Sequence, residues 1–216
     1  MASPTVRKLI LLRHGQTEWN AGERMQGQID TDLTELGRTQ AKEAARELAA
    51  LQPIAIVSSD LRRAYDTAAE LADSASLTVA VDPRLRETHL GDWQGLDHNE
   101  VDEQYPGARL AWRADATMAP PGGETRLDVA RRSRPVVDEL LGTAQWQARP
   151  VVLVAHGGLI AALTASLLDL PVARWPILGG LGNTSWVQLA AHGEGLDVAW
   201  RLDVWNASAK VASDVL

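Results

Sequence analysis

A run of four aliphatic residues, Leu9 to Leu12, ends abruptly in Arg13, His14 and Gly15. Uninterrupted aliphatic runs of this length are typical of strands that are buried on both faces of a sheet. A strand that ends in an imidazole places the ring at the carboxyl edge of the sheet, where open α/β folds bind their ligands. The adjacent guanidinium can donate two hydrogen bonds to a phosphate, and glycine lets the backbone approach closely. Taken alone, the triplet predicts an anion site or, equally well, a capped strand with a structural histidine.

Strands and helices alternate along most of the chain. Three further apolar runs predict buried strands, at 54–57, 78–81 and 151–155. Apolar residues at helical spacing predict four helices, at 34–51, 61–73, 125–142 and 159–168, the second of them capped by residues 58–60. Near the C-terminus, two segments predict a closing antiparallel pair of strands, at 184–190 and 197–203. This order predicts an α/β fold with a mainly parallel central sheet that is covered by helices on both faces.

The length of 216 residues is enough for one well-buried α/β domain and short of two, so we expect a single domain over residues 1–216. The stretch 13–33 is polar and predicts a long functional loop. The stretch 97–124 is irregular, mixed in charge and punctuated by proline and glycine. We expect this excursion to hold one short helix, near 98–104, and to act as a lid, since insertions of this kind commonly do. Pro135 lies inside a predicted helix, so a kink or break is expected there.

The composition excludes several classes of protein. A net charge of −7 argues against general affinity for nucleic acid or an anionic membrane, so an anionic substrate needs a locally basic pocket. Cysteine is absent, which excludes disulfides, thiolate metal sites and a cysteine nucleophile. The first residues show no signal sequence and no run is long enough to span a membrane, so the cytoplasm is the expected compartment. Two glycosylation-like triplets, at 183–185 and 206–208, carry no weight without a secretory signal.

Residues suited to phosphate follow each of four predicted parallel strands. They are Arg13 and His14 after the first, Arg62 and Arg63 after the second, Glu87 after the third and His156 after the fourth. Because the carboxyl ends of parallel strands lie at one edge of a sheet, all of these residues can converge on one cleft.

Such a cleft is suited to phosphoryl transfer, which depends mainly on charge neutralisation and alignment. Two guanidinium groups and two imidazoles can provide both without a metal ion, and we expect no cofactor. A nucleophilic His14 must be unprotonated on its attacking nitrogen, with the other nitrogen held by a partner such as the Gly15 carbonyl. The leaving alkoxide needs a proton, and a carboxyl group can deliver it if apolar surroundings or like charge raise its pKa. Glu87 is the candidate for that role.

Each of these residues also has an ordinary structural explanation. A histidine at a strand end, such as His156, is more often a satisfied structural residue. An arginine pair on a helix is more often a solvated face, with Asp66 as an i,i+4 partner of Arg62. A loop glutamate such as Glu87 usually serves only solubility.

The sequence resembles the histidine phosphatase (phosphoglycerate mutase-like) superfamily. The resemblance rests on motifs in the same order and spacing along nearly the whole chain, at 12–20, 26–27, 33–37, 58–64, 85–95 and 154–158. It implies a phosphoglycerate mutase-like fold and a metal-independent phosphatase in which His14 becomes phosphorylated. By the same resemblance, Glu87 is the proton donor and acceptor. The implied phosphate ligands are Arg13, Asn20, Gln26, Arg63 and His156, with Arg63 and not Arg62 at the family's arginine position.

A narrower resemblance, to the mycobacterial-type glucosyl-3-phosphoglycerate phosphatases, covers the segments 25–28, 87–96, 106–113 and 200–208. It implies hydrolysis of glucosyl-3-phosphoglycerate to glucosylglycerate, a precursor of methylglucose lipopolysaccharides, by a homodimer. A glycerate carboxylate requires a cation beyond the phosphate pocket, and the candidates are Arg24, Arg109 and Arg113. The sugar requires a flat apolar face, which Trp112 or Trp19 can provide.

Three other functions stay open at this stage. A phosphoglycerate mutase would use the same phosphohistidine but exclude water from it. Another small-molecule phosphatase of the superfamily would differ in its substrate, for example a sugar phosphate or a nucleotide-loop precursor. A non-catalytic module that binds phosphorylated ligands is the remaining alternative, because a fold alone does not prove activity.

Overall fold

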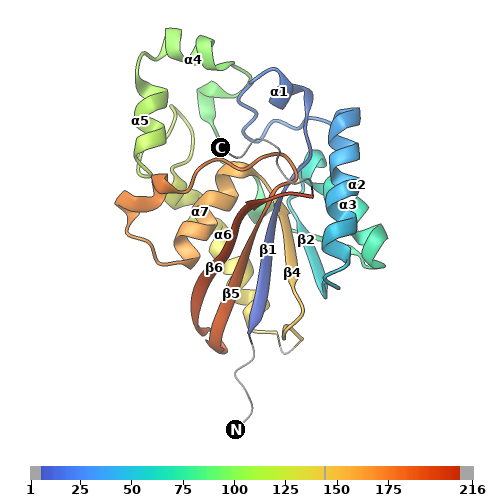
Figure 1. Ribbon diagram of the computed structural model, residues 1–216. Helices are drawn as coiled ribbons and strands as arrows, with labels where there is room; N and C mark the ends of the chain where they lie inside the picture. The colour runs from blue at the N-terminus through green and yellow to red at the C-terminus, as the bar shows by residue number, and fades with distance from the viewer. Residues whose placement is uncertain (1–5, 144, 210–216) are drawn as a thin grey trace.

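The computed structural model describes residues 6–143 and 145–209 and contains one six-stranded sheet with helices on both faces (Figure 1). The order of strands across the sheet is β3-β2-β4-β1-β5-β6. Their bounds are Arg7–Arg13 (β1), Ala55–Ser58 (β2), Val79–Val81 (β3), Val151–Ala155 (β4), Trp186–Glu194 (β5) and Asp197–Ala207 (β6). β1 to β4 are parallel, whereas β5 runs antiparallel to both β1 and β6. The predicted fold class is therefore confirmed.

The helices form two layers and a group above the sheet. α2 (Glu35–Ala49) and α3 (Arg62–Ala75) cover one face, and α6 (Arg126–Leu141) and α7 (Gly157–Leu167) cover the other (Figure 1). Shorter elements lie in the connections: α1 (Glu18–Ala21), α4 (His98–Gln104), α5 (Ala108–Ala114), η1 (Pro83–Leu85), η2 (Gly91–Trp93) and η3 (Val172–Ile177). α1 was not expected within the loop 13–33, and α5 was not expected within the excursion 97–124.

Alternate residues of β1 point into the two layers of the core. Leu9 and Leu11 pack on the side of α6 and α7, and Ile10 and Leu12 pack on the side of α2 and α3. All four side chains are at most 2% exposed. An all-aliphatic strand is stable here because both of its faces are removed from water.

Local hydrogen bonds set where the long helices begin. The Thr34 hydroxyl accepts from the backbone N–H of Gly37 and starts α2, as expected for an N-cap threonine. The cap predicted at residues 58–60 for α3 is wrong, because the N-cap is Leu61, which has no side-chain acceptor. The carboxylate of Asp30 instead accepts from the backbone N–H of Arg62 at 2.8 Å. A residue distant in sequence therefore caps α3.

Helix α6 runs from Arg126 to Leu141 without a break, although Pro135 lies inside it. Proline removes the N–H that would bond to the carbonyl four residues earlier. That carbonyl belongs to Arg131, an exposed residue, so water can satisfy it. The predicted break at Pro135 is therefore wrong.

The excursion 97–124 has a small core of its own above the carboxyl edge of the sheet (Figure 1). Its centre is Trp93, which meets Trp112 edge-on with ring centroids 5.8 Å apart and also packs against Tyr105. Met25 and Val101 complete the cluster. These contacts fix α4 and α5 over the edge at which β1 and β4 end.

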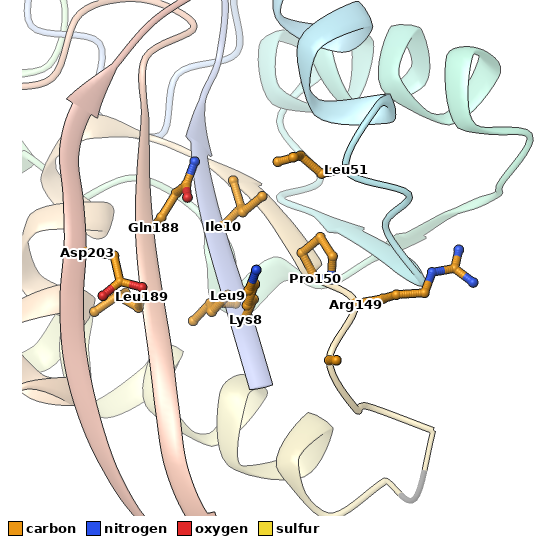
Figure 2. A pocket seen from close by; sticks show the side chains of 10 residues that line it. Lys8, Leu9, Ile10, Leu51, Arg149, Pro150, Gln188, Leu189 and Asp203 are labelled. Carbon is orange, nitrogen blue, oxygen red and sulfur yellow. The ribbon is translucent and has the colours of Figure 1, made fainter. Parts of the chain in front are cut away.

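At the opposite end of the sheet lies a separate hollow of about 220 Å³, shown in Figure 2. Lys8, Ile10 and Gln188 line it from β1 and β5, with Arg149 and Leu51 on its rim. None of the residues predicted to bind phosphate lies there. Within residues 6–143 and 145–209, no helix combines the length and apolar character needed to cross a bilayer.

Candidate active site

Two histidines face each other where the central strands end. The parallel pairing of β1 with β4 sets Arg13 opposite Ala155, so the next residue of each strand is a histidine at the same edge. The rings of His14 and His156 lie 5.1 Å apart between centroids, tilted by 57°. The structure thus brings together two residues that are 142 positions apart (156 minus 14).

His14 is held in one tautomer. Its Nδ1 lies 2.7 Å from the carbonyl oxygen of Gly15, which can only accept, so Nδ1 carries the proton. The lone pair is then on Nε2, the ring nitrogen that the Gly15 carbonyl does not occupy. Burial, and then the positive charges of Arg63 and Arg13, lower the pKa of His14 well below 6.5. The ring is therefore neutral near pH 7, with its free nitrogen available for attack.

Close glycine contacts fix the carbonyl that orients His14. A Cβ on Gly15 would lie 2.4 Å from the carbonyl oxygen of Gly37, in the first turn of α2. A Cβ on Gly37 would lie 2.0 Å from the carbonyl oxygen of Gln16. The backbone N–H of Gly15 also donates to the hydroxyl of Thr67 at 3.0 Å. The loop after β1 is thus clamped between α2 and α3.

Two arginines lie beside the histidine pair. Arg63 is 1% exposed, and its guanidinium donates to the carbonyls of Ile29 and Gly27 at 2.8 Å each. Burial lowers the pKa of Arg63 to about 10, so the group stays charged near neutral pH. Arg13 donates to the carbonyl of Leu181, and burial also lowers its pKa. The Nε atoms of both arginines are buried and have no partner among the described residues, so each can donate to a bound anion.

The neighbouring Arg62 points elsewhere. Its side chain is 61% exposed and pairs with Asp30 and Asp32 in the preceding loop. The suggested i,i+4 pair with Asp66 is not formed, since Asp66 pairs with Arg38 at 3.9 Å. Of the two adjacent arginines, only Arg63 reaches the histidines.

The side chain of Glu87 lies against the N-terminus of α7. Its carboxylate accepts from the backbone N–H groups of Thr88, Gly158 and Leu159 at 2.8–3.0 Å. A helix N-terminus and the nearby Arg13 and Arg63 thus surround this side chain, rather than the apolar residues or like charge that favour a proton donor. The carbonyl of Glu87 accepts from Arg132 at 2.9 Å, which fixes the backbone behind the carboxylate.

A hollow of about 170 Å³ joins most of the predicted site residues. The predicted residues on its wall are Arg13, His14, Asn20, Arg24, Gln26, Arg63 and Glu87. The amide oxygen of Asn20 already accepts from Thr17 and from Asn183, so its NH₂ group is free to donate into the hollow. Arg24 donates to the carbonyl of Gly95 at 2.6 Å and pairs with Glu100.

His156 lies behind this wall and is fully buried. Its Nε2 lies 2.9 Å from the hydroxyl of Ser59, and its Nδ1 has no partner among the described residues. Burial, Arg63 and His14 lower the pKa of His156 well below 6.5. It is a second neutral imidazole packed against the first.

A larger hollow of about 460 Å³ adjoins the first and shares Thr88, Trp112 and Gly158 with it. Arg113, one of the three candidates for a carboxylate beyond the phosphate, lines this second hollow. Arg109 does not line it and instead pairs with Asp102. Of the two tryptophans suggested for the sugar, Trp112 lines both hollows, whereas Trp19 lines neither.

Several residues of the site were missed from the sequence. Asn183 donates to the His14 carbonyl at 3.2 Å and to Asn20, yet its triplet resembled only a glycosylation site. The Thr67 hydroxyl accepts from the backbone N–H of Gly15. Thr67 is four residues after Arg63, so it lies on the same face of α3, and this spacing could have identified it. Arg126 lines the second hollow from the start of α6, and no motif marked it. In the described part of the chain, no group of three or more His, Cys, Asp or Glu residues could hold a metal ion.

Known proteins share both the sequence and the fold. The model of the histidine phosphatase superfamily (branch 1) matches residues 9–208. The glucosyl-3-phosphoglycerate phosphatase of Mycobacterium tuberculosis strain H37Rv is 65% identical over 220 aligned positions, which cover 97% of this chain and 99% of that protein.

Two solved structures of mycobacterial glucosyl-3-phosphoglycerate phosphatase are similar to this chain. One, in complex with VO₃, has a TM-score of 0.90 at 66% identity and covers 94% of this chain and 100% of its own. The other, with inorganic phosphate, has a TM-score of 0.88 at 63% identity and covers 95% and 100%.

Proposed function

The chain belongs to the histidine phosphatase superfamily, and on this premise we propose that it is a metal-independent phosphomonoesterase that hydrolyses glucosyl-3-phosphoglycerate to glucosylglycerate and phosphate. The observation that carries the proposal is the state of His14. A neutral imidazole presents a free nitrogen to a hollow that also holds two buried guanidinium groups. A phosphate group in this hollow would therefore lie beside both the nucleophilic nitrogen and the two cations that can bind its oxygens.

In the first step, Nε2 of His14 attacks phosphorus and the bond from phosphorus to the ester oxygen breaks. Glu87 enters this step in its protonated form and gives the proton to the departing oxygen, which leaves as the alcohol of glucosylglycerate; the carboxylate that remains accepts from the backbone N–H groups of Thr88, Gly158 and Leu159. The Gly15 carbonyl holds the Nδ1 proton, so positive charge on the phosphorylated ring is stabilised. In the second step, water attacks the phosphohistidine, Glu87 accepts its proton, and phosphate leaves.

Fixed donors in the hollow neutralise the phosphoryl oxygens during both steps. We assign this role to Arg13 and Arg63, whose Nε groups are unpartnered within the described chain, and to the amides of Asn20 and Gln26. The side-chain amide oxygen of Gln26 accepts from the Thr31 hydroxyl at 2.7 Å, so its NH₂ group is the part that would donate to a phosphoryl oxygen. His156 completes the set from behind the wall of the hollow, where its ring packs against that of His14 and its Nδ1 has no partner among the described residues. Such preorganised charge is commonly the largest contribution to phosphoryl transfer.

A panel of phosphate esters ranked by kcat/KM tests the substrate. It should contain glucosyl-3-phosphoglycerate, mannosyl-3-phosphoglycerate, 3-phosphoglycerate and simple sugar phosphates, and we expect the first to rank highest. If the label of 3-phosphoglycerate moved to an isomer with little phosphate released, the protein would be a mutase. If no ester were hydrolysed, the protein would be a binding module.

An acid quench during turnover tests the intermediate. We expect an acid-labile phosphate adduct on the peptide that contains His14, and no adduct in His14→Ala, which should have no turnover. An adduct on another peptide, or substantial activity of His14→Ala, would remove His14 from the role of nucleophile.

We also propose that the protein acts as a homodimer in the cytoplasm. β6 lies at the edge of the sheet, and its outer side pairs with no described strand over eleven residues, Asp197–Ala207. A long free edge of this kind is a common surface for pairing with a second chain. The mass measured by light scattering tests the dimer, and fractionation of cells tests the compartment.

A further inference from the structure

Two arginines of the second hollow lack carboxylate partners. Arg113 and Arg126 both line it, and neither forms an ion pair with any carboxylate in the described ranges. Arg109, which lies in α5 together with Arg113, is instead paired with Asp102. An anionic ligand in this hollow would therefore meet two guanidinium groups that form no salt bridge with the described residues.

The structure holds Arg126 in place without using up its donors. Its two terminal nitrogens donate to the carbonyl of Arg113 at 3.2 and 3.3 Å. The guanidinium carbon lies 5.6 Å from the ring centroid of Trp112, which is a cation–π distance. Since a guanidinium has five N–H groups, about three remain for a ligand. Burial and then the charge of Arg113 lower the pKa of Arg126, while the nearby carboxylate of Asp115 acts in the opposite direction.

We propose that the second hollow is a carboxylate subsite, in which Arg126 together with Arg113 binds the carboxylate of a phosphorylated hydroxy acid whose phosphate occupies the first hollow. This inference rests on the proposed function and names the part of the substrate that enters the second hollow. In glucosyl-3-phosphoglycerate, the phosphate is on C3, and both the carboxylate and the glucosyl oxygen branch from the neighbouring C2. One substrate can therefore place its phosphate in the smaller hollow and its other two groups in the larger one.

The lining of the second hollow accommodates the sugar as well. Beside the two arginines, its wall contains Trp112, Trp175 and Leu178. Aromatic and aliphatic side chains of this kind pack against the apolar face of a sugar ring. Because Trp112 lines both hollows, it lies at the passage between the phosphate and the rest of the substrate.

Two matched pairs of esters test the subsite. One pair is glucosyl-3-phosphoglycerate and the analogue with CH₂OH in place of its carboxylate, and the other is 3-phosphoglycerate and glycerol 3-phosphate. Competition of each ester with hydrolysis of p-nitrophenyl phosphate measures its binding even if it is not turned over. For each pair, the readout is the ratio of affinity or kcat/KM with and without the carboxylate, so that general damage to the enzyme cancels.

We expect Arg126→Gln to lower this ratio about 10- to 100-fold, the effect of losing a hydrogen-bonded ion pair. Arg126→Lys should recover part of the ratio because it restores the charge but not the planar fork. Arg131→Gln is the matched control, since this arginine lies further along the same helix, has a side chain that is 75% exposed and pairs with Asp128.

A ratio within twofold of the wild type in Arg126→Gln would overturn the proposal, as would a wild-type enzyme that shows no preference for the carboxylate in either pair. Equal losses on both members of a pair would mean that Arg126 only supports Trp112 and the excursion. The proposed function can fail separately. In that case 3-phosphoglycerate would be preferred over its neutral partner, and the glucosyl ester would not be hydrolysed.

Discussion

Because His14 and His156 are both neutral in the folded protein, we expect the free energy of unfolding to fall at acidic pH. Both His14 and His156 have a pKa well below the usual 6.5 because they are buried beside positive charge. In the unfolded chain, both titrate near 6.5. Between these values the unfolded state binds more protons than the folded state, so the free energy of unfolding falls as the pH falls. The stability is fully present above about pH 6.5, and the loss continues until the pH reaches the pKa values of the folded protein.

The size of the effect follows from the number of protons. Each histidine contributes a slope of up to about 1.4 kcal/mol per pH unit, so the pair contributes up to about 2.7 kcal/mol per unit. Between pH 7.0 and 5.5, with unfolded pKa values near 6.5, the two histidines together remove about 2.5 kcal/mol. This is a large share of the stability of an ordinary domain.

Urea unfolding at pH 7.0 and 5.5 in a buffer without phosphate measures this loss. The double variant His14→Gln/His156→Gln is the control, because glutamine does not titrate, and it should lose less than about 1 kcal/mol over the same range. A wild-type loss below about 0.5 kcal/mol, or an equal loss in the double variant, would refute the argument that both rings are buried in the neutral form.

Three further changes have defined outcomes. Glu87→Gln should lower kcat/KM about 100-fold or more on alkyl phosphates but far less on p-nitrophenyl phosphate, whose leaving group needs no proton; equal losses would indicate a role in folding or binding. Gly37→Ala would place a Cβ 2.0 Å from the carbonyl of Gln16 and should lower the free energy of unfolding by about 1–3 kcal/mol or more, whereas Gly179→Ala, with no atom within 4 Å, should change it little in the same urea titration. Asp30→Ala removes the acceptor that caps α3 and should cost about 1 kcal/mol of stability; an unchanged urea midpoint would show that the cap contributes nothing.

The sequence was most informative where a residue and its neighbours share one element. The aliphatic run before Arg13 predicted β1 because every residue in it is buried, and the Thr34 cap predicted the start of α2. The carbonyl partner of His14 could be anticipated because it belongs to the next residue. Only the family resemblance indicated that Arg63, and not Arg62, is the arginine that binds phosphate. The physical reason for the difference is simple. Successive residues of a helix point about 100° apart, so a single helix face buries one of them.

The sequence was least informative where a position depends on the fold of the excursion. α5 was missed because its residues pack on Trp93 in a small separate core, which has no strong periodic pattern. For the same reason, the sequence pointed to Arg109 and not to Arg126. The first is turned toward Asp102, while the second is brought under Trp112 only when the chain returns to α6. Neither contact is visible from spacing along the chain.

The arrangement resolves an apparent conflict between the nucleophile and its surroundings. Burial, and then the positive charges of Arg63 and Arg13, keep His14 unprotonated, but the same charges also make its lone pair less basic. When a phosphate with two negative charges enters the hollow, it offsets both guanidinium groups. The positive electrostatic field at Nε2 of His14 then weakens when the phosphorus atom of the substrate lies next to this nitrogen. The free enzyme therefore keeps its nucleophile neutral, and the substrate itself restores the reactivity of the imidazole. A phosphate-sized anion should accordingly raise the pKa of His14, and this ring should titrate at higher pH in the anion complex than in the free protein.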